Sequence, residues 1–170
     1  LEPIRQAGVM AILPRPFRRE ALERALSTCR SMKENSPLNV SVDFIQHKRV
    51  LLVDDSRMAR HHMSNVLGKV GFLNHNIVMA EDGQQAIALL EQGIEIDLVV
   101  TDYRMPHVDG EGLLHFIRQH SQYKDMPVIM VTSENNDTRL GSIKSQGVTA
   151  LMDKPFDVLH LKKILENQLA

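Results

Sequence analysis

Five short apolar runs, each followed by a more polar stretch, limit the folds open to this chain more than any other feature. The runs are RVLLV (49–53), NIVMA (76–80), DLVVT (97–101), PVIMVT (127–132) and TALMD (149–153). Runs that are apolar throughout, rather than at every second residue, are typical of strands buried on both faces. The sequence therefore favours a parallel sheet, because helices cover both faces of such a sheet.

Apolar residues at helical spacing occupy most of the stretches between these runs. They form four stripes: Met63, Val66, Leu67 and Val70; Ala86, Ile87 and Leu90; Leu113, Leu114 and Ile117; and Leu161, Ile164 and Leu165. Strands that alternate with helices predict right-handed crossovers, and so an open, doubly wound α/β domain with five parallel strands. The segment 136–146 is polar apart from Leu140 and Ile143 and contains Gly141, so we expect its helix to be the least stable and the most mobile.

The overall composition excludes several classes of protein. Lys and Arg (20) nearly balance Asp and Glu (21) among the 170 residues, which gives no electrostatic basis for binding nucleic acid or an anionic membrane. The apolar runs are too short to span a bilayer, and the first residues, LEPIRQAG, do not resemble a signal peptide. A single cysteine, Cys29, cannot form an internal disulfide. We therefore expect a cytoplasmic protein without nucleic-acid or membrane partners.

The N-terminal segment resembles the end of the chain. Residues 4–26 align without gaps with residues 143–165, and eight of the 23 positions are identical: Ile4, Gly8, Val9, Ala11, Pro16, Phe17, Leu22 and Leu26. We interpret 1–33 as the final strand and helix of a preceding copy of the same domain, 34–47 as a linker and 48–170 as a complete domain. A fortuitous amphipathic helix is the alternative. An exposed apolar strand favours aggregation, so we expect 1–33 to dock on the 48–170 domain or on another chain, as in a dimer.

Polar residues stand where the predicted strands end. Asp54 and Asp55 follow the first run, Asp102 follows the third, Thr132 and Ser133 close the fourth, and Lys154 follows the fifth. The carboxyl ends of parallel strands share one edge of a sheet, so these side chains should converge. Taken singly, each has an ordinary interpretation as a helix cap, a turn residue or a solvated lysine. Together, three carboxylates predict a Mg²⁺ site, because adjacent acids need a cation or shifted pKa values at neutral pH.

Five motifs in order carry a resemblance to a known family: LLVDDS, AEDGQQAI, DLVVTDYRMPHVDG, PVIMVTS and DKPF. Across 49–170 the chain resembles the receiver domain of two-component response regulators, close to the single-domain chemotaxis type with a flavodoxin-like (CheY-like) fold. The resemblance implies that Asp102 accepts a phosphoryl group from a histidine kinase or phosphotransfer protein.

The same resemblance assigns roles to the other rim residues. Asp55 and Asp102 would bind Mg²⁺ directly, Asp54 would act through water, and the backbone carbonyl of Arg104 would be a further ligand. Thr132 would donate a hydrogen bond to the phosphoryl group, and Lys154 would pair with its oxygens. Pro155 after Lys154 suits a cis peptide bond.

Two positions modify the comparison with receiver domains. Leu151 stands where receivers of this type usually carry Tyr or Phe, so the resemblance does not carry an aromatic switch over to this chain. Arg104 and Glu134 flank the route of the attacking water in the family, and we hypothesise that a pair between them slows dephosphorylation.

Three functions remain open at this point. The first is a phosphorylated signalling domain that is not an enzyme and that contacts a downstream protein through the 136–169 surface. The second is a phosphohydrolase of the haloacid-dehalogenase type, although Arg104 stands where that chemistry needs a second acid. The third is a receiver-like adaptor that is not phosphorylated. We interpret the histidines as surface or helix-face residues, and the methionines, Met58 and Met79 among them, as core residues.

Overall fold

A five-stranded parallel sheet forms the centre of the domain. The computed structural model describes residues 42–133 and 137–168 of the chain. The strands are β1 (Val50–Val53), β2 (Ile77–Ala80), β3 (Leu98–Asp102), β4 (Val128–Thr132) and β5 (Ala150–Asp153). They run parallel in the order β2-β1-β3-β4-β5. Each strand lies within about one residue of an apolar run, and the predicted fold class is confirmed.

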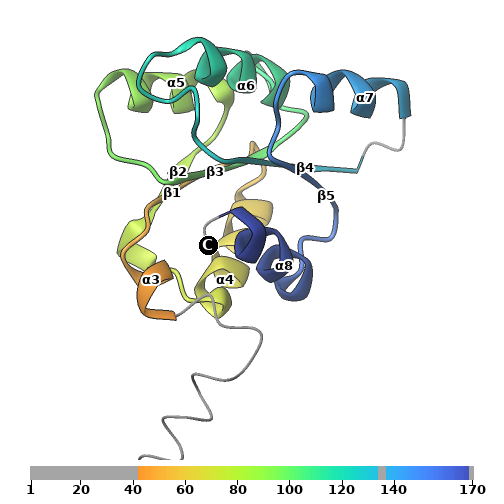
Figure 1. The fold of residues 1–170 in the computed structure, drawn as a ribbon. Coiled ribbons are helices and arrows are strands. Elements are labelled where there is room, and N and C mark those ends of the chain that lie inside the picture. Colours follow the sequence, from red (N-terminus) through yellow and green to blue (C-terminus); the bar gives the residue numbers. More distant parts are fainter. Residues whose placement is uncertain (1–41, 134–136, 169–170) are drawn as a thin grey trace, which may run out of the picture. The chain divides into compact units, whose positions relative to one another are not determined.

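Helices cover both faces of this sheet. They are α3 (Val42–Gln46), α4 (Arg57–Val70), α5 (Gly83–Glu91), α6 (Gly110–Gln119), α7 (Asp137–Ser145) and α8 (Val158–Gln168), with a short 3₁₀ helix η1 (Asn74–Asn76). In Figure 1, α5, α6 and α7 lie on one side of the strands, and α4 and α8 lie on the other with α3. The first crossover, through α4, thus lies on one face, and the next three, through α5, α6 and α7, lie on the other, because the strand order changes direction beside β1.

The core consists of two apolar layers separated by the sheet. Val50 and Leu52 of β1 face the α4 and α8 layer, whereas Leu51 and Val53 face the α5 and α6 layer. The central strands β1, β3 and β4 are buried along their whole length. The predicted stripes are all buried or half-buried, and each packs into one of these layers. On α7, Ile143 is fully buried and Leu140 is half-buried, so this helix is held by fewer apolar side chains than α4, α5, α6 or α8.

The helix α3 is a feature that the sequence did not predict, because it lies within the expected linker 34–47. Its Ile45 is only 2% exposed and joins the core, and Asn76 Nδ2 donates a hydrogen bond to the Gln46 carbonyl oxygen (2.7 Å). Five residues are too few for an independent helix, so these tertiary contacts stabilise it. The expected strand and helix within 1–33 lie outside the described residues, and the proposed domain boundaries stay a prediction.

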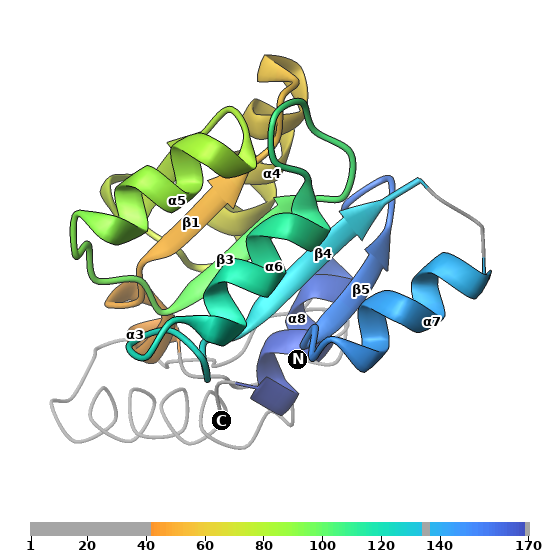
Figure 2. The same cartoon turned by 90° about the horizontal axis from the view of Figure 1, so that it is seen from above.

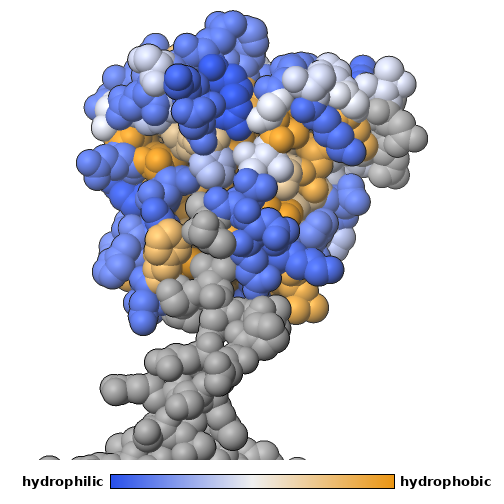
Figure 3. Space-filling view, in the orientation of Figure 1, coloured by the Kyte–Doolittle hydropathy of each residue, from blue (hydrophilic) through white to orange (hydrophobic). Residues whose placement is uncertain are grey.

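Two methionines that were predicted to lie in the core are exposed on the surface. Met58 is 84% exposed and Met79 is 44% exposed, so the expectation that they fill the core is wrong. In Figure 3, hydrophilic residues dominate the visible face, and hydrophobic ones show mainly where the helix layers meet the sheet. Within the described part of the chain, no helix combines the length and apolar character that a membrane span requires.

Candidate functional site

The polar residues that were predicted to converge do meet at the carboxyl edge of the sheet. Asp102 and Thr132 are the last residues of β3 and β4, while Asp54 and Lys154 directly follow β1 and β5. Figure 2 shows the arrowheads of β1, β4 and β5 pointing toward the same edge. The register pairs Asp102 with Val131 and Thr132 with Asp153, which brings the ends of β3, β4 and β5 level with one another.

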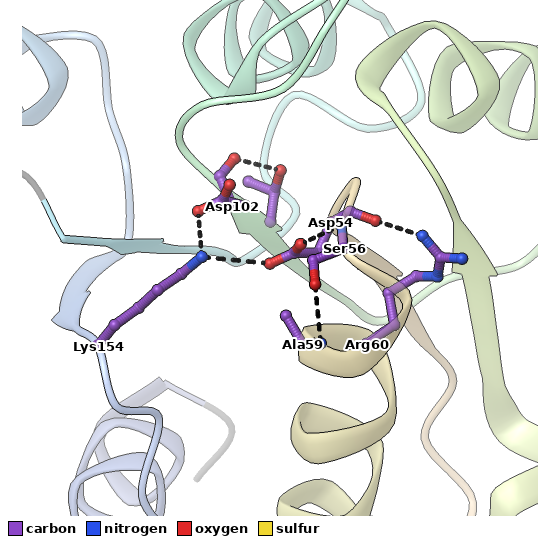
Figure 4. A network of polar contacts seen from close by, with 7 residues as sticks. Asp54, Ser56, Ala59, Arg60, Asp102 and Lys154 are labelled. Atoms are coloured by element: carbon purple, nitrogen blue, oxygen red, sulfur yellow. Dashed lines mark hydrogen bonds and ion pairs between the residues drawn. The ribbon is translucent and has the colours of Figure 1, made fainter.

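Lys154 reaches across this edge to two carboxylates. Its Nζ lies 2.9 Å from Asp102 Oδ1 and 3.4 Å from Asp54 Oδ2, as Figure 4 shows. Its backbone N–H donates to the Thr132 carbonyl oxygen (2.9 Å), which fixes the start of the side chain beside β4. The Lys154–Pro155 peptide bond is cis, as the sequence suggested. The ammonium group is thus held between the ends of β1 and β3.

Three carboxylates form a compact cluster beside that ammonium group. One oxygen from each of Asp54, Asp55 and Asp102 lies within 4.8 Å of the others. Asp54 is fully buried and Asp102 is 6% exposed, whereas Asp55 is exposed. Oxygen ligands that can be approached from solvent suit Mg²⁺, which keeps several of its waters. The donor set therefore fits the predicted ion.

Burial and charge shift the pKa values of this ion pair. Burial raises the pKa of Asp102, the nearby Asp54 charge raises it further, and the hydrogen bond and charge of Lys154 compensate only in part. For Lys154, burial alone would lower the pKa, but Asp102 and Asp54 together outweigh it and raise the pKa. The difference arises because the Lys154 side chain is one-third exposed and faces two acids. Asp102 is thus an acid whose charged form is disfavoured by the fold.

Several of the other predicted positions can be located. Thr132 is buried at the end of β4, while Ser133 and Arg104 are exposed. Leu151 is half-buried on β5, level with Met130 of β4. Glu134 lies outside the described residues, so the Arg104–Glu134 pair stays a prediction.

Sequence reasoning missed two residues that border the site. Arg60 is nearly buried, and its Nη1 donates to the Asp54 carbonyl oxygen (2.7 Å). The sequence held a signal for Arg60, because it lies three residues before Met63 and so on the apolar face of α4. His107 adopts a left-handed backbone (φ 64°) and its Nδ1 lies 2.8 Å from Asp82 Oδ2. No sequence pattern pointed to His107.

Glycines allow the loops at this edge to pack closely. A Cβ atom on Gly110, the first residue of α6, would collide with the carbonyl oxygen of Asp102. The Gly110 N–H instead donates to the Tyr103 carbonyl oxygen (2.9 Å). The turn after β3 can therefore close tightly behind Asp102 only because residue 110 has no side chain.

Comparisons with known proteins agree with this geometry. The family model described as "Response regulator receiver domain" matches residues 50–166. A chemotaxis protein CheY homolog of Campylobacter jejuni is 34% identical over 121 residues, which cover 71% of this chain and 92% of that protein. Chemotaxis protein CheY-3 of Vibrio cholerae is 35% identical over 121 residues, which cover 71% of this chain and 91% of that protein.

A solved structure has the same architecture. The chemotaxis response regulator CheY4 of Vibrio cholerae superposes with a TM-score of 0.62 at 32% identity, covering 71% of this chain and 97% of that one. Residues 50–166, which the family model matches, contain the five strands, the acid cluster and Lys154. The chain therefore belongs to the response regulator receiver domain family, and its role is that of a phosphoacceptor in signalling.

Proposed function

We propose that Asp102 is the residue that accepts the phosphoryl group. The observation that carries this assignment is the 2.9 Å contact between Asp102 Oδ1 and Lys154 Nζ inside a cluster of three carboxylates. Asp102 is the last residue of β3, the central strand of the sheet, so the backbone that carries its carboxylate is fixed. The raised pKa of Asp102 supports the assignment, because a buried acid with a disfavoured charge is typical of a functional position.

The acid cluster offers ligands for the ion that receiver domains bind at their acidic pocket. Asp54, Asp55 and Asp102 would hold Mg²⁺ together with the backbone carbonyl of Arg104. A bound Mg²⁺ ion supplies positive charge that offsets the repulsion between carboxylates and phosphoryl oxygens.

The chemistry of Asp102 is a transfer of one phosphoryl group. An oxygen of Asp102 forms the new P–O bond while the P–N bond of a donor phosphohistidine breaks, and the leaving imidazole takes up a proton. Lys154 Nζ pairs with the phosphoryl oxygens, and the Thr132 hydroxyl donates a hydrogen bond to one of them. Both side chains act mainly by position and charge, as is usual for phosphoryl transfer.

Receiver domains are signalling domains, generally not enzymes, that interact with histidine kinases and downstream targets. For this chain we propose Mg²⁺-dependent self-phosphorylation and slow self-dephosphorylation only, in the cytoplasm, with a downstream protein bound at the 136–169 surface. Support for that surface comes from α8, where Leu159 is 78% exposed, and from α7, which has few buried side chains. The comparisons do not favour the phosphohydrolase or the adaptor.

Acetyl phosphate tests the assignment directly. The wild-type chain is incubated with acetyl phosphate and Mg²⁺ and then analysed by intact-mass spectrometry. We expect one added phosphoryl group in the wild type, none after chelation of Mg²⁺, and none in Asp102→Asn.

Asp109→Asn is the matched control. Asp109 caps α6 by accepting from the Gly112 N–H (2.8 Å), and asparagine is an equally good cap. It should therefore be phosphorylated like the wild type. Phosphorylation of Asp102→Asn at the wild-type rate would show that another residue is the acceptor.

A further inference from the structure

We propose that Arg60 is a positioning residue for the metal-binding acids, and that it acts by holding the backbone of Asp54 rather than by lending its charge. This inference rests on the proposed function, because it concerns the same carboxylates. It adds a residue from inside α4 that contacts neither the ion nor the phosphoryl group.

The first support is the contact between Arg60 and the loop that carries both acids. Arg60 is 9% exposed, and its Nη1 donates to the Asp54 carbonyl oxygen at 2.7 Å. The Asp54 N–H donates to the Ala80 carbonyl oxygen (3.3 Å). Both backbone polar groups of Asp54 are therefore fixed from outside the loop.

The peptide plane explains why this contact reaches the side chains. The Asp54 carbonyl and the Asp55 N–H belong to one rigid peptide unit. A guanidinium that holds this carbonyl fixes the plane between the two acids, and so the directions in which Asp54 and Asp55 leave the backbone. In Figure 4, Arg60 and Lys154 lie on opposite sides of Asp54, one at its backbone and one at its carboxylate.

A second contact anchors the guanidinium itself. Arg60 Nη2 lies 3.0 Å from Glu81 Oε1, and the Glu81 N–H donates to Gln85 Oε1 (2.6 Å). Glu81 directly follows β2, so Arg60 joins the ends of β1 and β2. The planar guanidinium serves both contacts from two nitrogens in fixed directions, whereas a lysine ammonium is a single point charge on a flexible stem.

Charge and position predict opposite effects, which allows the two to be separated. The removal of a cation near three carboxylates would strengthen Mg²⁺ binding by Coulomb's law. The loss of a fixed peptide plane would weaken it. Arg60→Lys keeps the charge and loses the fork, whereas Arg60→Met loses both.

The experiment measures Mg²⁺ affinity of the full chain by NMR titration, using the amide signals of residues 54–56. If Arg60 positions the acids, both Arg60→Lys and Arg60→Met raise the dissociation constant about tenfold, as loss of an outer-shell contact does elsewhere. The phosphorylation rate at saturating Mg²⁺ stays within about threefold of wild type, because Lys154 and Asp102 are untouched. Glu81→Gln, which keeps the contact to Asp54, is the matched control and should change affinity less than twofold.

Other outcomes would overturn the inference. Tighter binding in Arg60→Met with an unchanged Arg60→Lys would mean that charge alone acts. Unchanged affinity in both variants with a lower melting temperature would mean that Arg60 only stabilises the fold. A further measurement uses the wild type and does not depend on how a variant folds. Its Arg60 guanidinium NMR signals should shift when Mg²⁺ is added, and unshifted signals would also refute the role of Arg60. A wild type that binds no Mg²⁺ would overturn the proposed function as well, whereas unaffected variants of a Mg²⁺-binding wild type would overturn only the role of Arg60.

Discussion

The two ends of the same parallel sheet use polar side chains in opposite ways. At the amino end, the Arg118 guanidinium donates to the carbonyl oxygens of Gly147 (2.9 Å), Lys124 (3.1 Å) and Met126 (2.8 Å). The Tyr123 hydroxyl lies 3.0 Å and 3.1 Å from the carbonyl oxygens of Leu90 and Ile94. At the carboxyl end, three carboxylates lie within 4.8 Å of one another, and two of them, Asp54 and Asp102, share one ammonium group.

This difference separates stabilising polar groups from functional ones. Donors at the amino end meet neutral carbonyl acceptors, so each contact favours the folded state. Acids at the carboxyl end face other acids, so their charged forms cost stability until a cation offsets them. The arrangement at the carboxyl end therefore persists for binding and chemistry, and the rest of the domain must compensate for it.

The largest effect should come from removing the Arg118 hydrogen bonds at the amino end of the sheet. Arg118→Met keeps much of the aliphatic stem and leaves three carbonyl groups without their donor. We expect the free energy of unfolding to fall by about 2 kcal/mol, because a bond from a charged donor is worth roughly 1.5–3 kcal/mol and two of the contacts are exposed. Urea unfolding measures it.

Lys162→Met is the control, since it removes a positive charge from an exposed position on α8. It should change stability by less than about 0.5 kcal/mol. An equally small effect for Arg118→Met would show that water replaces the guanidinium at these carbonyls.

The next effect has the opposite sign and comes from removing one carboxylate at the carboxyl end of the sheet. Asp102→Asn removes an acid whose pKa is raised by burial. In Mg²⁺-free buffer we expect this variant to be more stable than the wild type by about 1 kcal/mol at neutral pH, the size typical of relieving a functional site. The variant would thus lose phosphorylation and gain stability.

The pH dependence gives the sign of this effect. An acid with a raised folded pKa carries no penalty while it is protonated, and the penalty grows as pH rises through that pKa. The stability gap between Asp102→Asn and wild type should therefore be small in acid and widen toward neutral pH. Asp43→Asn, on the exposed start of α3, is the control for this measurement. A stability gap that narrowed as pH rose would contradict the conclusion that the charged form of Asp102 destabilises the fold.

How much of this contrast the sequence could predict depends on whether a contact follows from the positions of strand ends or from side-chain geometry. The meeting of Asp54, Asp102 and Lys154 followed from strand ends alone, because a parallel sheet brings its carboxyl ends together. The partners of Arg118 could not be predicted, since a guanidinium at residue 118 reaches Gly147, 29 residues away, through side-chain geometry that no periodicity encodes. The helix α3 was missed for a similar reason, as it depends on the burial of Ile45.

The last effect, about as large as that of Asp102, comes from Asp82, an acid at the carboxyl end whose contacts favour the folded state as those at the amino end do. A hydrogen bond from the Gln85 N–H lowers the pKa of Asp82, and His107 adds to this lowering. Asp82 caps α5, so Asp82→Ala should lower the free energy of unfolding by about 1 kcal/mol. Asp82→Asn keeps the cap and should lower it by only a few tenths of a kcal/mol.

Because its folded pKa is depressed, the contribution of Asp82 is present at neutral pH and is lost as pH falls through that pKa. Wild type and Asp82→Ala should therefore converge in acid, and at neutral pH the wild type should be the more stable of the two, whereas beside Asp102→Asn it should be the less stable. Urea unfolding of both variants between acid and neutral pH decides this, and parallel curves for wild type and Asp82→Ala would show that the Asp82 carboxylate is not a charged cap.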